Sequence, residues 1–239
     1  MARVNIGRRS VLGRLDLYAK RFDLVEVRPD PAAPIRPSVL KKWRESVPAA
    51  FVFSVVLPPI VGELRGDRAA SQALEHSLEV ARILQSPVML VATPPSVTPT
   101  TSNRKKLQEL IGRIPNDVVR IAWEPSGLWE LEDARAVAAA CKVVLVGDAA
   151  REPLAPGSVA YTRLRGLGDS RRLSARRLDA VVESLRGRRD VFVVIETDGA
   201  VQVARSVREA LLHGDASSPR APRQRAAAMP LAAEDEEQE

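Results

Sequence analysis

The sequence predicts an α/β fold, an eight-stranded parallel (β/α)8 or TIM barrel, and three observations lead to this prediction. Short β-branched runs alternate along the chain with longer segments of helical periodicity, and eight such runs can be counted. Most runs are almost continuously apolar, as expected of strands that are covered on both faces in a parallel sheet. The length of 239 residues is close to the ~250 that is typical of this fold.

The first half of the chain supplies four expected strands and three expected helices. Pro37 suits the first turn of a helix, where its missing N–H group would have no partner in any case. In the longest helix Ala70, Leu74 and Leu84 fall close to one apolar stripe. The strands are expected at 3–7, 23–28, 51–57 and 88–94, and the helices at 10–21, 36–46 and 67–85.

The second half repeats the alternation. Its only gap is the proline-rich segment 149–158, which has room for a short helix at most. An open, doubly wound sheet is the alternative fold, but it requires a glycine-rich phosphate-binding motif after an early strand, and none is present. The strands are expected at 118–125, 142–148, 159–166 and 190–196, and the helices at 103–114, 128–140, 174–188 and 200–213.

We expect one domain over residues 1–213, followed by a disordered acidic tail at 214–239. The tail has few large apolar residues and ends in an acidic cluster, a composition that cannot build a core. The net charge is +6, but the tail holds six acidic and three basic residues, so the domain carries about nine excess positive charges. A positive body favours anionic partners without distinguishing a phosphorylated metabolite from nucleic acid.

Composition also indicates the compartment. No run of about 18 apolar residues could span a membrane. The basic N-terminus lacks a long apolar segment, so we expect no secretory signal. The single cysteine, Cys141, cannot form an internal disulfide and is expected to be a buried structural thiol. These features favour a cytoplasmic protein.

Four stretches stand out in order over roughly residues 3–212: YAKRFDLVEVRPDP, VLKKWRESVPAAFVFSVVLPP, YTRLRG and DVFVVIETDGA. Together they resemble the YecE-like family, domain of unknown function 72. The pattern of that family includes a W-x-x-x-x-P-x-x-F-x-F-x-V-K-x-P block and a Y-x-R-x-H-G motif. The resemblance implies a TIM-barrel fold, in agreement with the strand count, and no established activity.

The chain departs from the family pattern where polar residues are expected. The family lysine falls at Val56, the family histidine at Arg165, and the paired asparagines near Glu196 and Thr197. The family's E-F-R-H-P motif on the fifth strand becomes IAWEP, which contains Glu124. The sequence is therefore similar to a divergent member, in which the family's chemistry is altered or lost.

Charged residues late in four strands predict a site at the mouth of the barrel. Alternate side chains of a barrel strand point inward, and ligands bind at the C-terminal ends of the strands. An unpaired buried charge is costly, so these groups should pair with one another or with a ligand. By this parity the expected site contains Glu26, Arg28, Glu124, Asp148, Tyr161, Arg163, Arg165 and Glu196, and Gly166 lies beside it.

The residue types suggest roles for this set. Forked guanidinium groups such as Arg163 and Arg165 suit carboxylate or phosphate oxygens, and Gly166 with Gly168 could present backbone N–H groups to an anion. Glu124 and Glu196 are the candidate catalytic acid and base. The function predicted is binding of a small anionic ligand. The residues identify no cofactor and no oligomeric state.

Other interpretations stay open at this point. The mouth could hold a purely structural ion-pair network, or a carboxylate-bound Mg²⁺ or Mn²⁺, although neighbouring arginines would compete for the carboxylates. A histidine-based zinc site is not expected, because neither His76 nor His213 lies at a strand end. A nucleic-acid or repair-linked barrel is weakly supported, because only nine aromatic residues are present. A barrel without catalysis that acts as an interaction module is the remaining alternative.

Overall fold

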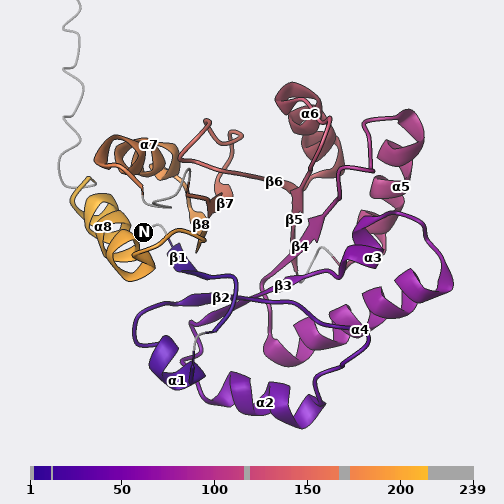
Figure 1. Cartoon of the computed structure of the whole chain (residues 1–239), viewed down its shortest axis with the longest axis horizontal. Helices are drawn as coiled ribbons and strands as arrows, with labels where there is room; N and C mark the ends of the chain where they lie inside the picture. Colours follow the sequence, from indigo (N-terminus) through magenta and orange to yellow (C-terminus); the bar gives the residue numbers. More distant parts are fainter. Residues whose placement is uncertain (1–2, 12, 116–118, 167–172, 215–239) are drawn as a thin grey trace, which may run out of the picture.

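The computed structural model describes residues 3–11, 13–115, 119–166 and 173–214, and shows a closed parallel barrel. Each strand pairs with its neighbours in the sequence, and β8 pairs with β1 to close the ring. Figure 1 shows the helices arranged around the central strands. The strands are β1 (Arg3–Arg8), β2 (Leu24–Val27), β3 (Val52–Val56), β4 (Val88–Ala92), β5 (Arg120–Glu124), β6 (Val144–Gly147), β7 (Val159–Leu164) and β8 (Asp190–Ile195). The TIM-barrel prediction is therefore confirmed.

The closure of the barrel depends on β1, which pairs with β8 over five residues and with β2 over two. Gly7 lies opposite Leu24 of β2, and a Cβ atom at Gly7 would lie 1.6 Å from the Leu24 carbonyl oxygen. Only glycine allows the two backbones to approach so closely at this position.

The helices follow the expected order, with two differences. A four-residue helix that was not predicted, α3 (Pro59–Gly62), follows β3. The helix expected at 10–21 is reduced to α1 (Leu15–Tyr18), and Gly13, with φ +79°, has a left-handed conformation that a helix excludes. The other helices are α2 (Pro37–Glu45), α4 (Arg68–Leu84), α5 (Thr101–Gly112), α6 (Leu131–Cys141), α7 (Ala175–Leu185) and α8 (Ala200–Gly214).

The strands separate two hydrophobic cores, as their alternation requires. The inner core fills the barrel with side chains such as Leu24, Leu90 and Phe192. The outer core packs the opposite strand faces against the helices and includes Trp123, which contacts Trp129 edge-to-face with ring centroids 4.9 Å apart. The inward and outward assignments made from sequence parity are confirmed by this division.

Three other expectations concern Cys141, membrane-spanning helices and the C-terminal tail. Cys141 is only half-buried, so the prediction of a buried thiol is wrong; it ends α6, and partial burial raises the pKa of its thiol. Within the described part of the chain, no helix is both long and apolar enough to cross a membrane. The tail expected at 214–239 lies outside the described residues except for Gly214, which ends α8.

Candidate functional site

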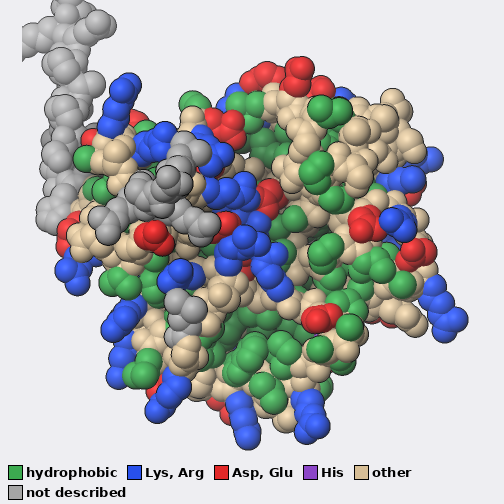
Figure 2. Space-filling model, viewed as in Figure 1, with side chains coloured by type: hydrophobic (Ala, Val, Ile, Leu, Met, Phe, Trp, Pro, Cys, Tyr) green, Lys and Arg blue, Asp and Glu red, His purple; other side chains and the backbone are tan. Residues whose placement is uncertain are grey.

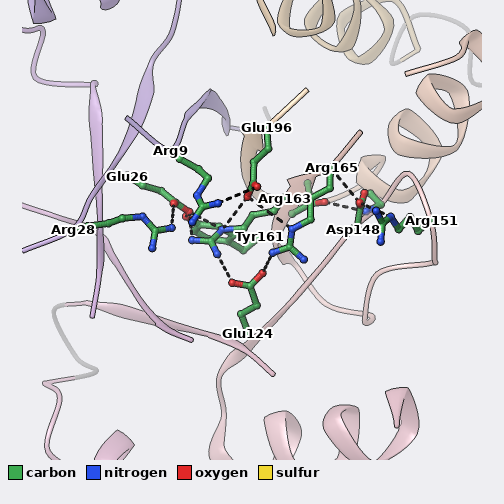
Figure 3. A network of polar contacts seen from close by, with 12 residues as sticks. Arg9, Glu26, Arg28, Glu124, Asp148, Arg151, Tyr161, Arg163, Arg165 and Glu196 are labelled. Atoms are coloured by element: carbon green, nitrogen blue, oxygen red, sulfur yellow. Dashed lines mark hydrogen bonds and ion pairs between the residues drawn. The ribbon is translucent and has the colours of Figure 1, made fainter. Parts of the chain in front are cut away.

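Seven predicted site residues come together at the C-terminal mouth of the barrel (Figure 3), and five of them form its inner part. Glu26 lies on β2, Glu124 ends β5, and Tyr161 and Arg163 lie on β7. Glu196 follows β8 directly. The first four are buried, and Glu196 is partly buried. Because all five have inward parity near the ends of their strands, the barrel brings them together across large separations in sequence.

Arg163 is the centre of the cluster. Its Nε and Nη2 atoms donate to Oε1 of Glu26 at 2.9 and 2.6 Å, and its Nη1 atom donates to Oε2 of Glu124. Burial lowers the pKa of Arg163, but the charges of Glu26 and Glu124 outweigh it and hold the pKa above its ordinary value. The guanidinium group therefore remains charged although its side chain is only 4% exposed.

Glu26 uses both carboxylate oxygens. The Tyr161 hydroxyl donates to Oε1 at 2.8 Å, and Nη2 of Arg28 donates to Oε2 at 2.8 Å. The Ser54 hydroxyl lies 3.0 Å from the Tyr161 oxygen and donates to it, because the tyrosine proton is directed at Glu26. Burial and the charge of Glu26 raise the pKa of Tyr161 well above its ordinary value, so the phenol stays a donor.

Three arginines form the rim of this cluster. Arg165 donates through Nη2 to Oε1 of Glu124, and Arg9 donates through Nη1 to Oε2 of Glu196 at 3.2 Å. Together with Arg28, these side chains are between 40% and 49% exposed. Each is anchored at one end of its guanidinium group by a carboxylate while its remainder faces solvent.

Glu196 has one carboxylate oxygen that lacks a hydrogen bond. Its Oε1 atom is buried and accepts no hydrogen bond from any described residue. The nearest cations are the Nε atoms of Arg163 and Arg165, each 3.9 Å away, a distance that allows charge attraction but no hydrogen bond. This oxygen therefore has no hydrogen-bond donor among the described residues, but a ligand would reach it only after a neighbouring side chain moves.

Asp148 was predicted to belong to the same site, and it contacts that site through Arg165. Its Oδ2 atom accepts from the Arg165 backbone N–H at 3.1 Å, and its Oδ1 atom accepts from the Ala150 backbone N–H at 3.0 Å. Nε of Arg151 lies 3.2 Å from Oδ2. Asp148 therefore ties the end of β7 to the segment after β6, and its role in binding stays a prediction.

Sequence reasoning missed Arg9 and Arg151. Arg9 follows β1 and has the same parity as Asn5 and Gly7, which pair with inward-facing positions of β8, so the alternation could have identified it. Gly166 is half-buried beside Arg165, and its role in binding stays a prediction; Gly168 lies outside the described residues.

We refer to the residues that meet at the barrel mouth as the mouth cluster: Arg9, Glu26, Arg28, Glu124, Tyr161, Arg163, Arg165 and Glu196. Its four arginines and three glutamates give it one excess positive charge. The arginines accessible to solvent are the three on the rim. In the ranges that the structure describes, no group of three His, Cys, Asp or Glu side chains is arranged to hold a metal ion. The arrangement suits an incoming oxyanion better than a cation.

Solved structures with the same architecture show which proteins share this fold. A DUF72 family protein from Enterococcus faecalis aligns with a TM-score of 0.71 at 16% identity, covering 89% of this chain and 98% of the other. A DUF72 family protein from Thermotoga maritima aligns with a TM-score of 0.64 at 16% identity over 89% and 99%. A xylose isomerase domain containing protein from Salmonella typhimurium aligns with a TM-score of 0.59 at 12% identity over 87% and 96%. At these identities the likeness concerns the fold alone.

Sequence comparison gives the family. No curated protein sequence matches the chain. The model described as "Protein of unknown function DUF72" matches residues 7–226, which is most of the chain, and confirms the resemblance carried by the motifs. The chain therefore belongs to the DUF72 family.

Proposed function

We propose that this protein binds a small anionic ligand, a carboxylate or a phosphate, at the mouth cluster. The observation that carries this proposal is the set of three half-exposed arginines around a buried ion network with one excess positive charge. An excess cation in a partly desolvated site attracts an anion more strongly than a surface arginine does, because screening by water is weaker there.

The arginines are also well prepared for binding. Arg9, Arg28 and Arg165 are each held by a carboxylate, so part of their side-chain entropy is already lost before a ligand arrives. A guanidinium group has five N–H donors. Each of the three arginines uses one of these donors in its hydrogen bond to a carboxylate, and the donors that remain suit the forked recognition of an oxyanion.

If the bound ligand reacts, proton transfer belongs to Glu196. Glu124 accepts from Arg163 through one oxygen and from Arg165 through the other, which commits it to structure. Glu196 keeps an oxygen, Oε1, that accepts no hydrogen bond from the described residues, although it is buried and lies 3.9 Å from two guanidinium nitrogens. Of the two carboxylates predicted as catalytic, Glu196 is therefore the one that would accept a substrate proton, after a side-chain movement that exposes Oε1.

The proposal is tested by calorimetric titration with inorganic phosphate. An Arg28→Gln variant should bind phosphate about ten- to hundredfold more weakly, the range expected when one charge-assisted hydrogen bond is lost. The fold should survive, because Glu26 keeps its bonds to Arg163 and Tyr161.

Arg82→Gln is the matched control. Arg82 is an exposed arginine on α4 that also pairs with a glutamate, Glu79, but it lies outside the mouth cluster. The control should bind phosphate as the unaltered protein does. Equal weakening in both variants, or no phosphate binding at all, would contradict the proposed function.

A further inference from the structure

A cavity of about 950 Å³ opens beside the mouth cluster. Its apolar lining comes from the first part of the barrel and from α2: Leu15, Val25, Val27, Ile35, Trp43 and Phe53. Figure 2 shows hydrophobic side chains gathered between α1 and α2, next to Lys and Arg side chains nearer the centre of the view. The volume lies near the upper end of the range of about 300–1,000 Å³ for small-molecule sites.

The shortness of α1 explains why the cavity exists. At 1.5 Å per residue, this four-residue helix is about 6 Å long, whereas the helices from α4 onward have 11 to 17 residues. It therefore covers little of the outer face of β2. Val25 and Val27, which point outward from β2, form part of the cavity wall.

The cavity and the mouth cluster are continuous. Arg9, Glu26 and Arg28 line the cavity and belong to the mouth cluster as well. Among the lining residues three arginines face two carboxylates, since Arg14 pairs with Asp16 at 2.7 Å and Arg28 pairs with Glu26. The polar edge of the cavity therefore has an excess positive charge, while its interior is apolar.

We propose that the ligand is an amphiphilic small molecule, with an oxyanion head on Arg9 and Arg28 and an apolar body against Ile35 and Trp43. This inference rests on the proposed function and names the class of ligand. A bare inorganic anion would occupy a small part of the cavity and leave the partly exposed side chains of its wall, Ile35 and Trp43, in contact with water, which is unfavourable. An apolar body removes that contact, and the half-buried Trp43 offers a flat surface for it.

A series of n-alkyl phosphates tests this inference on the unaltered protein. Methyl, butyl and hexyl phosphate carry the same head group and differ only in the length of the apolar body. We expect the dissociation constant to fall about two- to fourfold for each added methylene, the range for partial to complete burial. A dissociation constant that does not change with chain length would overturn the inference.

Two variants on the cavity wall sharpen the test. Trp43→Ala and Ile35→Ser should each reduce the gain in affinity per added methylene. Val39→Ser is the control, since Val39 lies on α2, is exposed and does not line the cavity. Circular dichroism checks that each variant is folded. An unchanged gain in both wall variants would count against the cavity as the apolar site.

The outcomes separate the two proposals. Methyl phosphate binding that Arg28→Gln weakens, together with no gain per methylene, leaves the proposed function standing and removes this inference. Failure of every alkyl phosphate and of inorganic phosphate to bind removes both.

Discussion

The two ends of the barrel use the same ionic groups in opposite arrangements. At the C-terminal mouth a buried cation, Arg163, is held among carboxylates. At the N-terminal end a buried anion, Asp190, is held by Arg3, Arg120 and Arg189. Asp190 is 4% exposed, but its three arginines are between 38% and 74% exposed.

The two ends differ in which cations of the ion pairs are exposed to water, all three arginines at the N-terminal end but only the carboxylates' rim partners at the mouth. At the N-terminal end the long arginine side chains extend into solvent, so their charges are screened and each contact resembles a surface salt bridge. At the mouth the guanidinium group itself is buried and depends on Glu26 and Glu124. The N-terminal cluster therefore joins strand ends, whereas the mouth cluster is a buried network that holds exposed arginines, the place where we propose that a ligand binds.

The largest expected effect is on stability when the buried cation is removed. Arg163→Met leaves the carboxylates of Glu26 and Glu124 without their main partner and should cost about 3–5 kcal/mol of unfolding free energy. The corresponding change at the other end, Arg120→Met, should cost less than about 1 kcal/mol, because Asp190 keeps two arginines. Urea unfolding of both variants measures the difference, and equal losses would show that the two ends do not differ as described.

An alkaline titration tests how well the structure shields its two tyrosines from water, one inside the barrel and one in the outer core. The chain has two tyrosines, and burial raises the pKa of both Tyr18 and Tyr161 above the ordinary value of about 10. Because the folded-state pKa is raised, the stabilisation from each protonated tyrosine is fully present below pH 10. It falls by about 1.4 kcal/mol per pH unit for each tyrosine as pH rises from 10 toward the folded-state pKa.

Phenolate absorbance near 295 nm should therefore appear only together with unfolding. Tyr161→Phe removes one of the two contributions and should make the alkaline decline in stability less steep. Phenolate absorbance in a protein that is still folded near pH 11 would mean that water reaches a tyrosine that the structure buries.

The smallest expected effect concerns acid stability at the N-terminal end. Burial raises the pKa of Asp190, but hydrogen bonds from Arg3 and Arg189 outweigh it and hold the pKa below its ordinary value. This stabilisation is present above the unfolded pKa of about 3.9 and is lost as pH falls below it. Asp190→Asn should flatten the decline in stability between pH 5 and pH 2 by about 1 kcal/mol or less, as measured by urea unfolding at each pH. A steeper decline in the variant would contradict this assignment.

The sequence predicted the fold and most of the mouth cluster for one physical reason. In a closed parallel barrel, strand parity and position along the strand together decide which side chains meet, and both can be counted from the sequence. Glu26, Glu124, Arg163, Arg165 and Glu196 were found in this way.

The sequence pattern does not give contacts that depend on local geometry. Asp148 follows β6 as Glu196 follows β8, but its carboxylate is bound by the backbone N–H groups of Ala150 and Arg165 and by Arg151. The segment around α1 has helical periodicity, yet Gly13 is left-handed and the helix is short. The cavity follows from that missing length, and periodicity alone cannot predict an empty space in the helix layer.

The most direct test of the account is to locate an anion in a crystal. Selenate is an oxyanion whose selenium atom gives an anomalous signal, so its position can be found without prior assumptions. Soaked crystals should show a peak within hydrogen-bonding distance of Arg9, Arg28 or Arg165 at the mouth. A peak beside Arg3, Arg120 and Arg189 with none at the mouth would contradict the account, because the N-terminal end would then be the anion site.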